Sequence, residues 1–482
     1  MKVIDFKYAS CKHCYKCVRS CSVKAIKVRD AQATIMDDHC VLCGTCLEVC
    51  PQNAKTFVSD LDRVRAFIAE EKKTVVSLAP AYLGILDYEK PGQVVDALLK
   101  LGFSEVRETA EGAAYVTEAY TKLLEAGQMK NIISTCCPSV NELVEKYYPE
   151  LVEDMAPVVS PMVAHGKLIK AMYGPDVKVV FIGPCIAKKQ EAEGDDRTTG
   201  FVDAVLNFEE VESWLQERDI SIRKCEEKQP ANPDPKVNRL YPVTSGVISS
   251  VLAKKKVDSY KKIFVDGIED CREVFEDMKK GLIEGCFIEA NMCEGGCVKG
   301  PAVNKLHISK YKATMVIEEQ VEKQDPAYPQ LAGNIDISKH FRSERIQDEM
   351  PTQEQITRIL KATGKYNKTQ ELNCGACGYP TCRDKAIAVF QGKAEQEMCL
   401  PHVYEKARSM SNVVLEATPE IVLIVDSAFQ IIEFNKRAED VFGINKSEAV
   451  NKMIFEIMDA SDFEQVLDDH LSIKRKKIHL SG

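Results

Sequence analysis

Three short cysteine motifs lie far apart in this chain of 482 residues. They are Cys136-Cys137-Pro138, Pro184-Cys185-Ile186-Ala187-Lys188, and the stretch EANMCEGGC, which carries Cys293 and Cys297. Thiolates are the soft ligands that select iron–sulfur clusters or zinc. Together the motifs provide enough thiols for a 4Fe-4S cube and leave one thiol of the adjacent pair free. A thiol has a pKa of about 8.5, so it can carry protons when its surroundings tune that pKa.

Eight further cysteines near the N-terminus repeat one spacing twice. Each run reads C-x2-C-x2-C-x3-C, and the runs are Cys11, Cys14, Cys17 and Cys21, then Cys40, Cys43, Cys46 and Cys50. In bacterial two-cluster ferredoxins the fourth cysteine of each run ligates the other cluster. The spacing therefore predicts one cube on Cys11, Cys14, Cys17 and Cys50, and another on Cys40, Cys43, Cys46 and Cys21. Two structural zinc sites are the alternative.

A third cysteine set lies towards the C-terminus. Cys374, Cys377, Cys382 and Cys399 follow the spacing C-x2-C-x4-C-x16-C. The set resembles the small 4Fe-4S module of corrinoid iron–sulfur proteins and membrane electron-transfer subunits. It predicts an additional cluster, with a zinc site as the alternative.

The elements that position the first three motifs can be read from the central third of the chain. Short β-branched runs at 74–80, 131–138 and 177–185 end at or just before a turn or a motif, and amphipathic stretches such as 92–102 and 141–155 follow or intervene. This alternation predicts parallel β–α units. In such folds ligands bind on loops at the carboxyl ends of strands, which is where these cysteines fall.

Bulk properties exclude several classes of function. The net charge of −9 argues against nucleic acid, because phosphate binding needs clustered Lys and Arg. No apolar run approaches the roughly 20 residues that span a bilayer, and the start MKVIDFKYAS lacks the apolar core of a signal peptide. The 20 cysteines then indicate metal binding rather than disulfides, and a cytoplasmic protein. Cys225, Cys271 and Cys286 fit no ligand pattern, so we expect them to be small buried hydrophobes.

The last 70 or so residues resemble the opening of a PAS domain. TPEIVLIVDSAFQIIEFNKRAEDVFGINKSEAVNKM predicts a strand, a turn, a second strand and a helix that begins near Asn435. The sequence stops at Gly482, before the last PAS strands are expected, so we expect a truncated PAS domain with an output module beyond it. A dimerisation scaffold that senses nothing is the alternative.

In this order, and together with the ferredoxin-like cysteine runs, the three central motifs resemble the signature of FeFe (iron–iron) hydrogenases. VVSLAPAYLG, LGFSEVRET and YYPELVEDMAPVVSPM also resemble stretches of that family's catalytic domain. The resemblance implies an H-cluster, which is a 4Fe-4S cube joined to a two-iron subsite carrying carbon monoxide, cyanide and an azadithiolate. It implies that the cube is held by Cys137, Cys185, Cys293 and Cys297, with Cys297 bridging to the subsite. It further implies that Lys188 hydrogen-bonds a cyanide and that Cys136 is the last proton donor.

The sequence departs from the fast members of that family around this centre. Val116 and Ala119 occupy the positions of the two relay glutamates, and Ala156 occupies that of the relay serine. Gly183 and Asn291 stand where two methionines usually line the two-iron subsite. Three nearby carboxylates could substitute in the relay, although each is more typical of a solvated charge: Glu108, Glu111 and Glu118. We expect a structural role for His165, in VVSPMVAHGK.

The prediction is a multidomain α/β protein with five segments. They are a two-cluster ferredoxin domain (1–60), an H-cluster domain (61–333), a linker with one helix (334–365), a 4Fe-4S module (366–405), and a connecting helix with a partial PAS domain (406–482). The resemblance implies reversible H2 oxidation and proton reduction, slow and of a sensory type.

The alternatives are a metabolic ferredoxin-linked hydrogenase with PAS as a scaffold, or a non-catalytic iron–sulfur protein without the two-iron subsite. The expected partners are H2 and protons, a ferredoxin or similar electron carrier, a second copy bound through the PAS segment and its helix, and a downstream signalling, phosphatase or kinase module. Neither nucleic acid nor a membrane is expected.

Overall fold

The computed structural model describes residues 2–458 except 8, 9, 31, 304–308, 323–328, 330 and 332. These residues form two compact units. The larger unit contains residues 1–359 and 371–395, and the smaller contains residues 360–370 and 396–482. The domain boundaries given above stay predictions.

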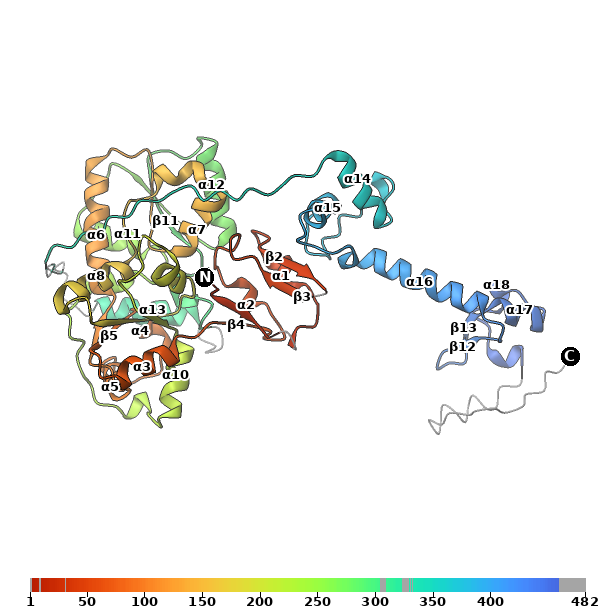
Figure 1. Cartoon of the computed structure of the whole chain (residues 1–482), viewed down its shortest axis with the longest axis horizontal. Helices are drawn as coiled ribbons and strands as arrows, with labels where there is room; N and C mark the ends of the chain where they lie inside the picture. The colour runs from red at the N-terminus through yellow and green to blue at the C-terminus, as the bar shows by residue number, and fades with distance from the viewer. Residues whose placement is uncertain are drawn as a thin grey trace. The chain divides into compact units, whose positions relative to one another are not determined.

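Two parallel sheets form the frame of the central domain (Figure 1). One has the order β6-β5-β8-β9, with β5 (Thr74–Leu78), β6 (Glu105–Glu108), β8 (Lys178–Ile182) and β9 (Ala204–Leu206). The other has the order β10-β11-β7, with β7 (Ile132–Ile133), β10 (Lys261–Asp266) and β11 (Cys286–Asn291). Every described pairing in both sheets is parallel. The expected parallel β–α units are present, divided between two sheets.

Helices cover these sheets and supply most of the core. They are α3 (Leu61–Ala69), α4 (Tyr82–Ile85), α5 (Gly92–Lys100), α6 (Ala110–Ala126), α7 (Pro138–Tyr147), α8 (Pro161–Tyr173), α9 (Ala187–Lys189), α10 (Phe208–Glu217), α11 (Gly246–Lys254), α12 (Ile268–Lys279) and α13 (Lys310–Glu322). Pro138 and Pro161 stand at the first position of α7 and α8, where a missing N–H costs nothing. One apolar cluster surrounds β5 and β8, and a second lies around β11, α7 and α12.

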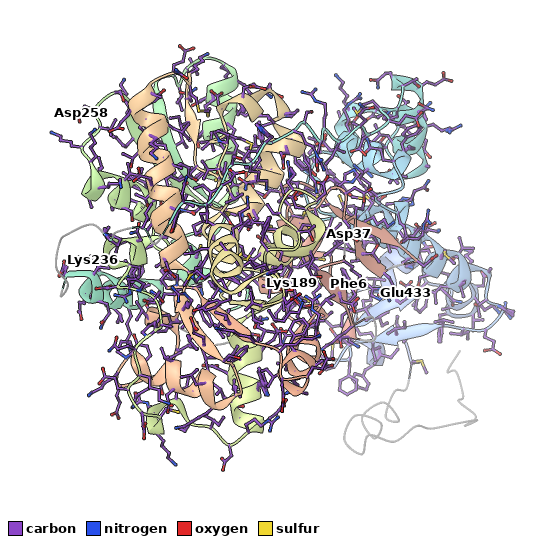
Figure 2. All side chains as sticks on the ribbon, turned by 60° about the vertical axis from the view of Figure 1, so that its left-hand side comes forward. Phe6, Asp37, Lys189, Lys236, Asp258 and Glu433 are labelled. Carbon is purple, nitrogen blue, oxygen red and sulfur yellow. The ribbon has the colours of Figure 1, made fainter. Side chains whose placement is uncertain are left out.

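The N-terminal segment forms a small domain of two antiparallel strand pairs and two short helices. Its elements are β1 (Ile4–Phe6) paired with β4 (Lys55–Phe57), β2 (Ile26–Arg29) paired with β3 (Gln32–Ile35), α1 (Lys16–Ser20) and α2 (Thr45–Glu48). Its Leu42 packs with Ile186 and Ala302 of the central domain. Lys189 lies inside the larger unit (Figure 2), and its Nζ pairs with Asp60 Oδ1 at 2.9 Å. The segment after the first domain is thereby tied to the Cys185 motif.

The rest of the larger unit includes most of α14 (Gln353–Ala362) and all of α15 (Cys382–Phe390). The backbone N–H of Val28 donates to Lys393 O at 2.9 Å, so the 371–395 segment contacts the N-terminal domain.

The smaller unit contains α16 (Leu400–Ala417), the antiparallel pair β12 (Leu423–Val425) and β13 (Ile431–Phe434), α17 (Lys436–Phe442) and α18 (Lys446–Ala449). Asn435 caps α17, as the sequence predicts. Residues 459–482 of the predicted PAS segment lie outside the described part of the chain.

Candidate metal centre

The four cysteines predicted to hold the catalytic cube converge from three loops. Cys137 lies between β7 and α7, Cys185 between β8 and α9, and Cys293 and Cys297 follow β11. Burial raises the pKa of the Cys293 thiol, and charge on the other three thiols raises it further. Burial and the same kind of mutual repulsion raise the pKa of Cys185 to about 11. Soft donors packed this closely suit a polynuclear iron cluster, which takes them as thiolates.

Two of these sulfurs lie at helix starts. The backbone N–H groups of Ser139 and Val140 favour the thiolate of Cys137, and those of Ala187 and Lys188 favour the thiolate of Cys185. N-terminal amides carry a partial positive charge, so they stabilise bound anions.

A cavity of about 80 Å³ adjoins these sulfurs. Its walls come from the ends of strands and the starts of helices: Ala79, Pro80, Thr109, Cys136, Cys137, Pro161, Met162, Phe181, Pro184, Cys185, Lys188, Tyr241, Pro242, Asn291 and Cys297. The lining is mostly apolar, with few polar groups. An apolar lining lowers the local dielectric constant, which strengthens each polar contact made inside the cavity.

Lys188 is the cation of this cavity. Its Nζ donates to Glu191 Oε2 at 2.6 Å and to Cys136 O at 3.2 Å. Burial alone would lower the pKa of Lys188, but the charges of Glu191 and Cys185 outweigh burial and raise it. The lysine therefore stays an ammonium, which can give a strong, orienting hydrogen bond to an anionic ligand. Ser160 Oγ also donates to Glu191 Oε2, at 2.8 Å.

Cys136 lies on the cavity wall and contacts Tyr120. The hydroxyl of Tyr120 is 3.2 Å from Cys136 Sγ, and burial raises the pKa of Cys136 to about 12. The Tyr120 hydroxyl also accepts from Thr135 N–H at 2.8 Å, and the Thr135 hydroxyl donates to the carbonyls of Ala156 and Val158. Carbonyl oxygens have no proton to pass on, so these bonds give Cys136 no route to the surface.

The replaced positions around the site have structural explanations. Val116 and Ala156 are fully buried in the apolar core. A Cβ at Gly183 would lie 2.7 Å from ring carbons of Phe181, so Phe181 fills that space as an apolar wall. Asn291 faces the cavity, and its Nδ2 donates to Glu289 Oε1 at 3.3 Å. Burial raises the pKa of Glu289 to about 7.

The three carboxylates considered as relay substitutes have different surroundings. Glu118 pairs with Lys122 and Lys254, and Glu108 is bound by Arg239, so both are occupied in ion pairs. Glu111 pairs with Arg107 and in addition accepts from His165 Nε2 at 3.1 Å. His165 is fully buried and hydrogen-bonded at both ring nitrogens, which fits the structural role expected for it.

The N-terminal cysteines of the second run lie near Cys21, and the crossed division of ligands between two cubes stays a prediction. Burial raises the pKa of Cys21, Cys40 and Cys46, and charge on neighbouring cysteines of this group, Cys43 among them, raises it further. Cys17 and Cys50 both act electrostatically on Lys55, so they too are near each other. The place of Cys11 and Cys14 in the first cube stays a prediction.

The Cys40–Cys46 loop lies against the central domain. Ser139 Oγ, in the first turn of α7, donates to Leu42 O at 3.1 Å. A Cβ at Gly44, where φ is +81°, would lie 2.3 Å from Pro301. Only glycine suits both that backbone conformation and the close approach. The second N-terminal cysteine group therefore adjoins the loop that carries Cys297.

The C-terminal cysteine set divides between the two units. Cys374, Cys377 and Cys382 belong to the larger unit and Cys399 to the smaller, so their convergence stays a prediction. Within the larger unit, Cys377 and Cys21 both raise the pKa of Tyr379, whose burial is the main cause. Within the smaller unit, Lys365 Nζ lies 3.2 Å from Cys399 Sγ.

Other expectations can be checked in the described residues. Cys225, Cys271 and Cys286 are buried, as predicted. Within the ranges described above, no three His, Cys, Asp or Glu side chains converge closely enough for one metal ion. Among those same residues, no helix is both long and apolar enough to cross a bilayer.

Comparison with known proteins gives a family for the central part. Residues 72–301 match the model of the iron only hydrogenase large subunit, C-terminal domain. The central domain belongs to the iron-only hydrogenase family. Residues 10–54 match a 4Fe-4S dicluster domain, 370–401 an Fe-S cluster model and 410–479 the PAS fold. The chain is thus a multidomain α/β protein that combines an FeFe-hydrogenase domain with ferredoxin-like and PAS segments.

Individual relatives are distant. Iron hydrogenase 1 of Clostridium pasteurianum is 27% identical over 401 residues, covering 60% of this chain and 69% of the relative. The periplasmic Fe hydrogenase large subunit of Nitratidesulfovibrio vulgaris is 29% identical over 267 residues, covering 43% of this chain and 61% of the relative. The chain spans 56% of the NADP-reducing hydrogenase subunit HndD of Solidesulfovibrio fructosivorans, at 23% identity. A variant FeFe-hydrogenase from Chlamydomonas reinhardtii has a similar structure, with a TM-score of 0.48, 18% identity, and coverage of 60% of this chain and 100% of that one.

Sequence reasoning missed several residues of the site. Tyr120, Phe181, Glu191 and Glu289 contact or line the cavity region without having been singled out. Glu191 could have been found, because it stands three residues after Lys188 on a helical stretch. Ser77 could also have been noticed, because it is a polar residue next to the apolar residues Val75, Val76 and Leu78 of β5.

Proposed function

We propose that the chain oxidises H2 and reduces protons reversibly at an H-cluster in the central domain. The observation that carries this proposal is the meeting of Cys136, Cys137, Cys185, Cys297 and a buried ammonium at one cavity, with Cys293 near three of these thiols. The donor set fits a cube on Cys137, Cys185, Cys293 and Cys297 with a two-iron subsite in the cavity. When bound, that group supplies the metal at which H2 is split or formed.

The protein's own residues bind and shield this centre. The amides at the starts of α7 and α9 favour the thiolates of Cys137 and Cys185. The Lys188 ammonium, oriented by Glu191, supplies a donor for an anionic ligand. Phe181, Met162 and Pro161 help exclude water from the cavity.

We propose that electrons pass through the N-terminal clusters to an external ferredoxin or similar carrier. The Cys40, Cys43, Cys46 and Cys21 group lies against the loops of the catalytic cysteines, which supports its role as the nearest electron donor. The contact of the 371–395 segment with β2 supports an additional cluster beyond the N-terminal pair. Free cysteines throughout the chain support a reducing, cytoplasmic setting.

The test is infrared spectroscopy of the full chain after maturation with the two-iron cofactor. We expect carbon monoxide and cyanide bands that change under H2. Cys185→Ser should remove these bands and the cube's iron. Cys225→Ala is the matched control, because this cysteine is also buried but lies outside the cavity, and it should keep the bands. Absence of bands in the unaltered protein would leave an electron-transfer protein without the two-iron subsite.

A sensory role with slow turnover is the finer part of this proposal. The glutamate–serine relay of the fast enzymes is replaced by apolar residues, which supports slow proton supply. Cys399 directly precedes α16, which runs into the PAS segment, so a cluster on Cys399 could shift that helix when its charge changes. If reduction of that cluster leaves hydrogen exchange in α16 and the oligomeric state unchanged, the coupling idea is wrong.

We further propose that α16 joins two copies of the chain. Its residues Leu400, Val403, Ala407, Met410, Val414 and Ala417 repeat with alternating spacings of three and four. Such a stripe suits a two-stranded coiled coil, and its large members are exposed by 38–64%. Sedimentation should show a dimer that Met410→Glu weakens, whereas Glu405→Lys, off the stripe, should leave the dimer intact. A monomeric unaltered protein would contradict this interface.

A further inference from the structure

A chain of hydrogen bonds leads from the cavity into the core of the central domain. Thr109 lines the cavity, and its Oγ1 lies 2.7 Å from Ser77 Oγ. Ser77 Oγ lies 2.7 Å from His165 Nδ1, and His165 Nε2 lies 3.1 Å from Glu111 Oε2. Three different elements contribute these side chains, namely β5, α8 and the start of α6.

Close packing of two helices creates the middle of this chain. A Cβ at Gly112 would lie 2.4 Å from Pro161 O and 2.7 Å from His165 Cβ. Gly112 therefore lets α8 approach α6 closely enough for His165 to reach Glu111. Ser77 and His165 are wholly buried, Thr109 is 4% exposed and Glu111 is 7% exposed.

The outer end is anchored by an arginine. Arg107 Nε and Nη2 donate to the two carboxylate oxygens of Glu111 at 3.0 and 2.9 Å. Burial opposes ionisation of Glu111, but the bonds from His165 and Arg107 outweigh it and hold the pKa of Glu111 below its usual range. Arg107 also contacts Glu105, which accepts from Tyr173 and is 18% exposed in its side chain. The polar groups thus continue from Glu111 towards the surface.

These partners fix the direction of the bonds. Because ionised Glu111 can only accept, His165 carries its proton on Nε2 and its Nδ1 accepts from the Ser77 hydroxyl. Burial also lowers the pKa of His165, which keeps the ring neutral. Ser77 then has its oxygen free to accept from the Thr109 hydroxyl. The oxygen of Thr109 is left as the acceptor at the cavity end.

We propose that Thr109, Ser77, His165 and Glu111 form a proton route between the cavity and the surface, in place of the missing glutamate–serine relay. This inference rests on the proposed function, because it supplies the protons of that reaction. A proton accepted at Thr109 Oγ1 displaces the Thr109 proton to Ser77, the Ser77 proton to His165 Nδ1, and the Nε2 proton to Glu111. Thr109, Ser77 and His165 each gain one proton and give one up, and no electron moves. Glu111, which is 7% exposed, releases the proton it receives to solvent water. Transfer towards the cavity follows the same atoms in reverse.

A purely structural network is the rival explanation. Buried polar groups must be hydrogen-bonded, and a satisfied network can simply hold helices together. The proton route differs because it requires the hydroxyl at the cavity end, which a buttress between α6 and α8 does not. Thr109 is therefore the residue that separates the two explanations.

The experiment compares hydroxyl removal at two places on α6, in the full chain matured with the two-iron cofactor. Thr109→Val removes the hydroxyl at the cavity, and Thr109→Ser restores one. Thr121→Val is the matched control, because its buried hydroxyl donates to Thr117 O outside the chain. The readouts are carbon monoxide and cyanide band intensity, the rate at which these bands convert under H2 in water and in D2O, and turnover.

We expect Thr109→Val to keep the bands but to slow their conversion and turnover by about tenfold or more, with a larger D2O effect. Thr109→Ser and Thr121→Val should stay within about twofold of the unaltered protein, since each keeps the chain's hydroxyls. Equal rates for Thr109→Val and Thr121→Val would overturn the proton route. Bands that fail to respond to H2 in the unaltered protein would instead overturn the proposed function, and the route with it.

A second readout needs no cofactor. Nitrogen-15 NMR of the unloaded full chain should place the His165 proton on Nε2, and Ser77→Ala should change the Nδ1 signal by removing its donor. A proton found on Nδ1 would overturn the route, because Ser77 could not then donate to the ring.

Discussion

Two walls of the same cavity differ in what lies behind them. Behind Cys136 are Tyr120 and Thr135, and the bonds from Thr135 end on the carbonyls of Ala156 and Val158. Behind Thr109 are Ser77 and His165, and the bonds continue to a carboxylate near the surface. Hydrogen-bonded side chains therefore lead away from the Thr109 wall, whereas the bonds from Thr135 behind Cys136 end on carbonyl oxygens. The difference teaches that the polar connection between a cavity and the rest of its domain need not begin at the thiol on the cavity wall.

The difference between the two walls also bears on why the residues behind Cys136 are apolar. Val116 and Ala156 fill the core where the relay of fast enzymes would run, and both are fully buried. Polar groups in that place would need partners, because an unpaired buried polar group costs free energy. The polar chain lies instead where Arg107 can neutralise its outer carboxylate. A carboxyl with a lowered pKa accepts protons poorly at neutral pH, which supports slow transfer.

Among changes on either side of the cavity, the largest effect is expected from Glu111→Gln. An amide cannot take up or release the proton, so turnover should fall by about tenfold. The free energy of unfolding at pH 7 should fall by about 3 kcal/mol, because Arg107 loses a buried partner. Turnover and the thermal midpoint of the central domain measure the two effects. A variant with unchanged turnover would place the proton route elsewhere.

The stability effect of Glu111→Gln should depend on pH. Because the folded protein lowers the pKa of Glu111, the stabilisation is fully present above the unfolded pKa of about 4.3 and is lost as pH falls through the lower folded pKa. The variant and the unaltered protein should therefore approach each other in stability below about pH 4. His165 changes stability with pH in the same direction. Burial lowers its pKa in the folded state, so the folded state becomes less favourable as the pH falls below about 6.5, in both proteins. A difference that stays constant from pH 7 to acid would contradict the ionised Glu111.

Much of this centre could be predicted from the sequence, because it depends on local spacing. Two repeated runs predict the crossed grouping of Cys21 with Cys40, Cys43 and Cys46, and these thiols lie near enough to raise one another's pKa. Strand ends at the three central motifs likewise follow from apolar runs that stop at a cysteine. Local patterns therefore sufficed to propose the ligands, whose binding of metal stays a prediction.

The proton route could not be predicted in the same way. Ser77, Thr109 and His165 meet only because β5, α6 and α8 pack together, and Gly112 permits that packing. As nearby carboxylates, Glu118 and Glu111 were equal candidates for the relay, yet Glu118 pairs with Lys122 and Lys254, whereas Glu111 reaches His165. The two glutamates differ in the direction their side chains take from the helix, and distance along the sequence does not reveal that direction. The space filled by Phe181 beside Gly183 was missed for the same reason.

A smaller effect is expected on the other wall, from Tyr120→Phe. The change removes the hydroxyl that contacts Cys136 Sγ and accepts from Thr135 N–H. Stability should fall by about 1–2 kcal/mol, because the buried Thr135 N–H loses its partner. Turnover should change by less than about twofold, because these bonds lead nowhere outward. A tenfold loss of turnover with intact cyanide bands would show that the wall behind Cys136 does carry protons.

The smallest effect is expected from Glu118→Gln, which lies on the same helix as Glu111. The Glu118 side chain is 26% exposed and pairs with Lys122 and Lys254, whose bonds outweigh partial burial and lower the pKa of Glu118. Pairs near the surface contribute about 0.5 kcal/mol, so the thermal midpoint should hardly move. Turnover should equal that of the unaltered protein when both are measured beside Glu111→Gln. Because the two variants make the same chemical change seven positions apart on α6, a difference between them isolates the bond to His165 from the general loss of a carboxylate. Equal losses in both would mean that charge on α6, and not the hydrogen-bonded chain, controls turnover.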